Sequence, residues 1–482
     1  MLWWAARQRG CSNSGGMMRT EARGELRWLL VAAGLGALAG LVVLLAQGEA
    51  VLFVGALAGL GVTAALLLGW PFSGVAILIV AALLTRFRVD VGPVSVRPEH
   101  VAAAAVAAVG FAQLGLERRR LRMPAPAWFA LAWWLINLVS GVLFDPDPMM
   151  GLQNALRISL LPLTFILVIN LIPDGKWWRR SVAFFLAAGV LEAAYGILAR
   201  ALYPAGVNLG VQVSWNFTEP IPYGTFEEGN LFGSHTASWA IILLMILFGA
   251  ERVRDSRKRQ LLRMAALGVL LIALLLSLSR AAWIMFLVGA MLVVIFEYRN
   301  AWAQWNRFLL ALVLAPLLAF GVLAIAPYLP ASLPFVNRLQ SFLNLGFDAT
   351  FSARLQDWSL ALADWSQRPI TGWGPGAFYA IHGMLRAHPA WISNLTVRLL
   401  HETGVIGLLA FGGFVATLLL PAIKAVRRPI EQMDRALLLG LVISYAVLLG
   451  VAYQSTDGIW LTASWVHAGL IAAGTRVVSE ER

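Results

Sequence analysis

Most residues that could do chemistry lie in one stretch of the chain, from Phe351 to Gly407, between long apolar segments. The stretch contains Arg354, His388 and Glu402 together with several tryptophans. Arginine binds anionic oxygens through a planar, permanently charged fork of donors. Histidine and glutamate can take a proton from an attacking hydroxyl group. These residue types are suited to binding an anionic group and activating a hydroxyl group beside it.

A further candidate, Arg280, stands between two apolar runs and directly follows Ser277 and Ser279. A charged side chain near the centre of a membrane helix costs about 2.5–3.5 kcal/mol, so such residues usually have a function. An arginine near a helix end can also extend to the membrane surface with no other role. Position alone leaves both interpretations open, and a third cation, Arg338, stands in the following loop.

The elements that must position these residues are membrane helices. The chain has 482 residues, of which 60% are hydrophobic and 13% charged, and this composition excludes a water-soluble fold. Apolar runs long enough to cross the bilayer recur along it, and their continuity favours helices over a barrel. We predict an all-α polytopic membrane protein with about 12–14 spans, at 28–47, 50–69, 71–85, 100–116, 126–144, 153–172, 181–202, 232–250, 262–278, 281–297, 308–327, 399–420, 436–453 and 459–475.

Charge placement predicts the orientation of these spans, because lysine and arginine are retained on the cytoplasmic side. The rule makes residues 1–27 a cytoplasmic segment and predicts that both termini are cytoplasmic, in a multi-pass protein of the plasma (inner) membrane. Spans 1–11 then occupy 28–327, and spans 12–14 occupy 399–475. The loop from Arg86 to Arg97 is the main exception, because it places arginines outside.

Two long segments are predicted on the outer face, at about 203–231 and 328–398. The larger is too rich in tryptophan for a disordered tether. Leu355, Trp358, Leu362 and Trp365 recur at helical spacing after Ser352, a candidate cap, which predicts a short amphipathic helix on the membrane surface. The prolines and glycines that follow predict a turn, at Pro369, Gly372, Gly374 and Gly376.

The order of motifs over 225–420 resembles the O-antigen ligase and polysaccharide polymerase family. The motifs are S-x-S-R at the outer end of a helix, R-x-x-x-W, R-P-x-x-G-x-G-x-G-x-F, and N-x-x-x-x-L-L-x-E-x-G-x-x-G before the next helix. In this chain they are Ser277–Ser279–Arg280, Arg354 with Trp358, Arg368 to Phe378, and Asn394 to Gly407.

The resemblance implies a GT-C-like glycosyltransferase that acts on the outer face of the plasma membrane without a nucleotide sugar. Its donor would be a glycan on polyprenyl pyrophosphate, and its acceptor a lipid, a protein or another glycan. No cofactor, metal or nucleic acid is implied, and the single cysteine, Cys11, excludes a cysteine cage for a metal. Ligase and polymerase reactions, the sugars and the oligomeric state are left open.

For the site, the resemblance implies that arginines bind the pyrophosphate or glycan. The substrate-binding candidates are Arg280, Arg354, Arg338, Asn394 and Ser393. The family usually has a histidine immediately before the asparagine, and here that residue is Ser393. The general base is therefore open among three residues, His388, His401 and Glu402, of which His388 and Glu402 are the catalytic candidates.

The first long loop resembles the family's G-T-F entry to a helix, but Ile221 and Pro222 stand where an arginine is frequent. Glu227 and Glu228 follow, and either could bind sugar hydroxyls or cap the next helix. Deeper in the bundle, Arg157 and Glu192 are predicted to pair, because membrane-buried charges usually do.

Two other functions are compatible with many helices and cationic cavities. One is a transporter or flippase of lipid-linked glycan, which would favour charges at the bilayer midplane, broken helices and an internal repeat. The other is an inactive scaffolding relative, which the serine at position 393 suggests. Transfer of a lipid-linked glycan in proteoliposomes separates the enzyme from both.

Overall fold

The structure is a computed structural model, and it describes residues 72–91, 94–116, 120–213, 220–250, 256–298, 340, 349–385 and 388–480. Three predicted spans, 28–47, 50–69 and 308–327, lie outside the described residues. Within the described residues, eight helices are long and apolar enough to cross a membrane. The predicted all-α polytopic class is confirmed.

The first part of the described chain is a series of helices interrupted by one two-stranded hairpin. Its elements are α4 (Phe72–Leu83), β1 (Val89–Val91), β2 (Val94–Val96), α5 (Pro98–Leu116), α6 (Ala125–Leu143), α7 (Pro148–Leu171) and α8 (Gly175–Leu202). The helices begin where the sequence favours it: Pro124 precedes α6, and the carboxylate of Asp147 accepts hydrogen bonds from the first-turn amides of α7.

The central part contains a second hairpin and three long helices. Its elements are a 3-10 turn (Tyr203–Ala205), β3 (Val211–Val213), β4 (Pro220–Pro222), α9 (Gly229–Ala250), α10 (Arg257–Leu276) and α11 (Arg280–Tyr298). A tight turn joins α10 to α11, so Arg280 is the first residue of α11. Leu278 in this turn has a positive φ of 50°, which few residues with a side chain adopt.

The last part begins with short elements and ends with three long helices. Its elements are α14 (Ala349–Gln367), α15 (Ala377–His382), β5 (Met384–Leu385), β6 (His388–Pro389), α16 (Leu395–Val426), α17 (Gln432–Gly450), a 3-10 turn (Ala452–Gln454) and α18 (Thr462–Glu480). Helices α9, α17 and α18 form the centre of the bundle, and Trp465 of α18 stacks on Trp133 and Phe414 with ring centroids 5.6 and 5.0 Å apart.

Helix α14 confirms the short helix predicted in the large loop, with one correction. It begins at Ala349, so Ser352 lies within the helix and is not its cap. Leu355 and Leu362 of the predicted apolar face are exposed, and Asp364 on the same helix is buried. The reason is a hydrogen bond from a histidine to the Asp364 carboxylate, at 2.8 Å, which compensates its burial.

The predicted glycine turn is confirmed and has a specific task. Gly372, Gly374 and Gly376 all have positive φ, and the amide of Gly374 donates a 2.8 Å hydrogen bond to the carbonyl of Glu402. Helix α16 is broken there, because Gly404 has φ 62° and ψ −165°. The break frees helical carbonyls to accept from the turn, so the turn fixes the first part of α16.

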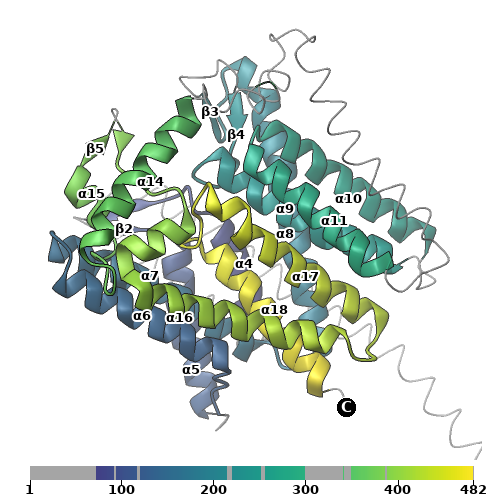
Figure 1. The fold of residues 1–482 in the computed structure, drawn as a ribbon. Coiled ribbons are helices and arrows are strands. Elements are labelled where there is room, and N and C mark those ends of the chain that lie inside the picture. Colours follow the sequence, from purple (N-terminus) through teal and green to yellow (C-terminus); the bar gives the residue numbers. More distant parts are fainter. Residues whose placement is uncertain are drawn as a thin grey trace, which may run out of the picture.

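The connecting segments of one side gather into what we call the loop end of the bundle. It comprises the segments 84–91, 94–97, 203–213, 220–228, 277–280, 349–385, 388–394 and 451–461. In Figure 1 the strands β3, β4 and β5 lie with α14 and α15 along the upper side, and the C-terminus lies at the opposite side. The predicted outer segments 203–231 and 328–398 thus meet at the same end, as far as the structure describes them.

Candidate functional site

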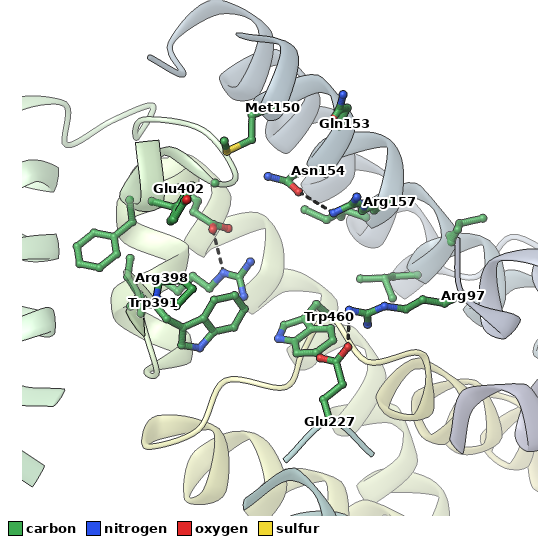
Figure 2. Close-up of a pocket in the computed structure, with 18 of the residues that line it drawn as sticks. Arg97, Met150, Gln153, Asn154, Arg157, Glu227, Trp391, Arg398, Glu402 and Trp460 are labelled. Carbon is green, nitrogen blue, oxygen red and sulfur yellow. Dashed lines mark hydrogen bonds and ion pairs between the residues drawn. The ribbon is translucent and has the colours of Figure 1, made fainter. Parts of the chain in front are cut away.

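A cavity of about 510 Å³ opens at the loop end. This is within the range of about 300–1,000 Å³ usual for ligand sites. Its walls come from the β1–β2 hairpin, α5, α7, the turn before α9, the loop before α16 and the start of α18, and Figure 2 shows side chains from several of these converging. The polar lining residues are Arg88, Arg97, Glu99, His100, Gln153, Asn154, Arg157, Glu227, Arg398, Glu402 and Thr462.

One end of the cavity, the α16 end, is built around Arg398. Its Nε donates to Glu402 Oε1 at 2.9 Å, one helical turn away, and its Nη1 donates to Asp457 Oδ2 at 2.5 Å. The guanidinium also lies 4.8 Å from the centre of the Trp391 ring. Arg398 is thus held by two carboxylates and an indole, and it holds Glu402 in the cavity wall.

The opposite end, the hairpin end, is built around Arg97. Its Nη2 lies 2.5 Å from Glu227 Oε1, its Nη1 lies 3.7 Å from Glu99 Oε1, and its guanidinium lies 5.2 Å from the centre of the Trp460 ring. Glu99 begins α5, which is not among the eight candidate spans. Burial raises the pKa of Glu99 to about 7, and burial also raises the pKa of Glu227.

Helix α7 forms the side wall between these ends. Asn154 Nδ2 donates to the carbonyl of Pro375 at 3.0 Å, which attaches α7 to the glycine turn. Arg157 Nη1 donates to Asn154 Oδ1 at 3.5 Å, and Figure 2 shows both side chains directed into the cavity. The predicted pairing of Arg157 with Glu192 is wrong: Glu192 accepts hydrogen bonds from the Thr225 amide and hydroxyl, both at 2.7 Å.

Of the predicted catalytic residues, the structure brings Glu402 into the cavity wall. His388 lies in β6, where its backbone pairs with Leu385, and its neighbours Pro389 and Ala390 line the cavity. His401 is fully buried and points to Asp364, with 3.3 Å between His401 Nε2 and Asp364 Oδ2. The packed, hydrogen-bonded state considered for His401 is therefore the observed one.

Asp364 joins two histidines of different elements. Its Oδ2 lies 2.8 Å from His382 Nε2 as well as near His401, and the ring of Phe378 packs against both imidazoles. Burial favours a raised pKa, but the hydrogen bonds from His401 and His382 outweigh it, so the pKa of Asp364 is lowered. This cluster connects α14 to α15 and α16. Phe378, which packs against both imidazoles, also lines the cavity.

Two predicted substrate-binding residues lie at the start of α16 with structural partners. Asn394 caps the helix by accepting from the Val397 amide at 2.9 Å, and its Nδ2 donates to the Gln454 carbonyl at 2.7 Å. Ser393 Oγ accepts from Trp358 Nε1 at 3.3 Å. Both side chains hold the loop end together next to the cavity, and neither is among its lining residues.

Arg280 and Arg354 do not line the cavity, and each is connected to α14, Arg280 through a hydrogen bond and Arg354 as one of its residues, so we refer to them together as the Arg280–Arg354 group. Arg280 Nη2 donates to Thr350 Oγ1 at 3.3 Å, which ties the start of α11 to the start of α14. Arg354 lies on α14 close enough to Glu228 to oppose the effect of burial, which raises the pKa of that carboxyl. Of the two adjacent glutamates, Glu227 thus interacts with Arg97 at the hairpin end and Glu228 interacts with Arg354. Arg338 lies outside the described residues.

Sequence reasoning did not find the hairpin end. Trp460 is far along the chain from Arg97 and Glu99, and none of the three stands in a recognisable motif. One signal was available: the loop from Arg86 to Arg97 departs from the expected charge distribution of membrane loops. Under the predicted orientation these arginines are unfavourable, and two of them, Arg88 and Arg97, line the cavity.

Fold and site together define a multi-pass membrane protein with a polar, arginine-lined cavity at one end of its bundle. Residues 265–412, from α10 into α16, match the family model described as O-antigen ligase. This match confirms the resemblance to the O-antigen ligase family and supports a role as a membrane enzyme of polysaccharide biosynthesis. No curated protein sequence matches the chain.

Proposed function

We propose that this protein transfers or polymerises a glycan carried on polyprenyl pyrophosphate, at the outer face of the plasma membrane and with both termini cytoplasmic. The acceptor is a lipid, a protein or another glycan. The observation that carries the proposal is the cavity itself: arginines, carboxylates and indoles from separate segments line one space, and part of its wall belongs to the region that matches the O-antigen ligase model.

The lining is suited to sugars. Trp391 and Trp460 stand perpendicular to each other with ring centroids 6.0 Å apart, and each is covered by a guanidinium. Indole rings provide flat apolar surfaces for sugar rings, while glutamates, Gln153 and Asn154 provide hydrogen bonds for hydroxyl groups. An arginine-rich wall alone would fit many anions. The indole rings and the amide side chains favour, among these ligands, one that carries a glycan.

Within this proposal the pyrophosphate binds the Arg280–Arg354 group, and the glycan extends from there into the cavity. The leaving group carries about two or three negative charges near neutral pH, and a fixed guanidinium stabilises charge that builds up as the bond breaks. The Glu227–Glu228 turn lies between the two regions, because its two carboxylates interact with Arg97 and Arg354 respectively. A donor spanning both would place its first sugar near this turn.

The reaction needs one bond formed, one bond broken and one proton moved. The acceptor hydroxyl oxygen forms a bond to the anomeric carbon of the donor sugar, and the bond from that carbon to the pyrophosphate oxygen breaks. Polyprenyl pyrophosphate leaves with the bonding electrons, and its charge is stabilised by Arg280 and Arg354. The hydroxyl proton passes to a base, and Glu402 is the candidate that lines the cavity.

His388 remains the second candidate for the base. It stands in the β5–β6 hairpin, beside residues that form the cavity wall. An imidazole has an ordinary pKa near that of a working base, whereas a carboxylate needs its environment to raise its pKa. The two predict different profiles of transfer rate against pH, so both belong in the same experiment.

The test is transfer of glycan from a polyprenyl-linked donor in proteoliposomes without nucleotide. We expect Arg280→Ala to lower the rate by about 10²–10³-fold, as loss of a charge-stabilising group does, with unchanged abundance in the membrane. Arg428→Ala, an exposed arginine in the turn after α16, is the matched control and should transfer normally. Glu402→Gln and His388→Ala identify the base.

Other outcomes of the transfer experiment would contradict the proposal. If wild-type protein that is folded and correctly inserted transfers nothing across several donors and acceptors, the enzyme proposal fails. If it then moves the lipid-linked glycan between leaflets, the transporter interpretation replaces it. If Arg280→Ala transfers as fast as wild type, the pyrophosphate does not bind the Arg280–Arg354 group.

A further inference from the structure

The arginines of the β1–β2 hairpin segment are the feature that the proposed reaction leaves unexplained. Membrane proteins avoid arginine in loops on the outer side, so each one kept there needs a use. The segment has three arginines with different surroundings: Arg86 lies over the Tyr223 ring at 5.4 Å and outside the cavity lining, while Arg88 and Arg97 line the cavity. Two of the three therefore face a ligand space.

These two are joined by Arg157, which reaches the same space from α7. Arg97 and Arg157 thus line one space from two different elements. Like charges at close range in a poorly solvated cavity repel each other unless negative charge compensates them. A ligand with negative charge can accept hydrogen bonds from several of these guanidinium groups at once.

Counting charges shows which end of the cavity would attract an anion. At the α16 end one arginine, Arg398, faces two carboxylates, Glu402 and Asp457, so that end is formally negative by one charge. At the hairpin end three guanidinium groups, those of Arg88, Arg97 and Arg157, line the cavity, and the carboxylates that line it with them are Glu99 and Glu227. An anionic group in the cavity therefore belongs at the hairpin end.

The two carboxylates at the hairpin end do not cancel this attraction. Burial raises the pKa of Glu99 to about 7, so close to neutral pH a large share of Glu99 is uncharged. Its Oε2 is buried and has no hydrogen-bond partner among the residues that the structure describes, and its side chain lines the cavity. A protonated carboxyl in this position would donate a hydrogen bond to an oxygen of the ligand.

We propose that Arg88, Arg97, Arg157 and Glu99 form an anion subsite that binds a phosphate or carboxylate group on the acceptor glycan. The proposal rests on the glycan transfer proposed above and makes the enzyme selective for acidic acceptors. Trp460, which Arg97 covers, provides the surface for the sugar ring that carries the charge. The donor's pyrophosphate is assigned elsewhere, because Arg280 and Arg354 do not line the cavity.

A binding measurement that needs no transfer tests the subsite directly. Wild-type protein in nanodiscs is titrated with glucose 6-phosphate, glucuronate and glucose, with tryptophan fluorescence as the readout. We expect the two acidic sugars to bind at least tenfold more tightly than glucose, and the preference to disappear in Arg97→Gln and Arg157→Gln. The phosphate and carboxylate sugars show which anion the subsite prefers.

Arg86→Gln is the matched control, because it removes an arginine of the same hairpin segment that lies outside the cavity lining. It should keep the preference for acidic sugars. Arg88→Gln is a second subsite variant, chosen because Arg88 is exposed and its loss threatens folding least. Equal binding of the three sugars by wild type, or an equal loss in Arg86→Gln and Arg97→Gln, would overturn the proposal.

Transfer kinetics then separate the acceptor from the donor. With a matched pair of acceptors, one phosphorylated and one neutral, Arg97→Gln should raise KM for the phosphorylated acceptor about tenfold, which corresponds to about 1.4 kcal/mol. It should leave KM for the neutral acceptor and for the donor within twofold of wild type. A raised KM for the donor with either acceptor would assign these arginines to the pyrophosphate and refute an acceptor subsite. Sugar binding with no transfer at all would instead refute the proposed function and keep the anion subsite.

Discussion

The two ends of the cavity are built from the same parts. At each end an arginine lies over an indole, with 4.8 Å for Arg398 on Trp391 and 5.2 Å for Arg97 on Trp460, and each arginine contacts two carboxylates. They differ in how the parts are assembled. Both carboxylates of Arg398 lie within 2.9 Å of its guanidinium nitrogens, whereas for Arg97 only Glu227 is that close and Glu99 lies 3.7 Å away.

This difference separates a rigid end from an adaptable one. The side chain of Asp457 is fully buried and that of Glu402 is 11% exposed, while Glu227 is 29% exposed. Ion pairs shielded from water depend strongly on their partners, and exposed pairs contribute little. We infer that the α16 end fixes the geometry of the reaction and that the hairpin end selects the substrate.

The largest expected effect tests the rigid end. Arg398→Met leaves two buried carboxylates without their cation and should cost about 3–5 kcal/mol of stability. Arg97→Met breaks a more exposed cluster and should cost about 1–2 kcal/mol. Thermal unfolding of the purified variants in detergent measures both, with Arg428→Met as an exposed control. Equal losses for Arg398→Met and Arg97→Met would remove the distinction between the ends.

A smaller effect tests how the α16 end is held. In Gly404→Ala the new Cβ would lie 2.2 Å from the Ile370 carbonyl oxygen, at a residue with φ +62°, so we expect a loss of about 1–3 kcal/mol. Gly412→Ala in the same helix meets no atom within 4 Å and should gain about 0.5–1 kcal/mol.

Binding of glucose 6-phosphate extends this comparison of the two glycines to the hairpin end. Gly404→Ala that still folds should bind the sugar phosphate as wild type does, because the break in α16 positions only the other end. A parallel loss of stability and of sugar phosphate binding would show that the two ends form one unit.

The smallest effect tests the adaptable end through pH. The pKa of Glu99 is raised to about 7, so its proton stabilises the fold at low pH, and this contribution is lost as the pH rises through about 7. Ionised Glu99 also adds negative charge beside Arg97 and Glu227. We expect KM for a glucuronate-bearing acceptor to rise about threefold to tenfold between pH 6 and 8, and Glu99→Gln to flatten the profile.

The choice of acceptor matters in this measurement, because a phosphate group titrates in the same range and a sugar carboxylate does not. Glu227→Gln reports any part of the slope that belongs to the second glutamate. A profile that stays steep in both variants would place the titrating group elsewhere.

The sequence alone predicted the fold class and the glycine turn, because both follow from local rules. Long apolar runs must become helices in a membrane, and glycines at Gly372, Gly374 and Gly376 permit the positive φ values found there. The position of Glu402 near other site residues followed from motif spacing. The inward face of α14 did not, because Asp364 is buried through partners on α15 and α16.

The hairpin end shows what local reasoning misses. Arg97 pairs with Glu227 and covers Trp460, and neither distance along the chain nor residue type indicates this meeting. The pairing predicted for Arg157 with Glu192 failed for the same reason, since Thr225 from a loop satisfies the glutamate. Tertiary contacts of loops decide both cases.

The order in which these residues are synthesised determines when each part of the cavity wall becomes available. The hairpin arginines are synthesised early. Glu227 can pair with Arg97 only after α8 has been made, and Trp460 and Thr462 are added with the last described helix, α18. Because proteins generally fold from the N-terminal part first, the cavity stays open on one side until α18 inserts. A nascent chain that ends before Trp460 therefore lacks two residues of the cavity wall, Trp460 and Thr462.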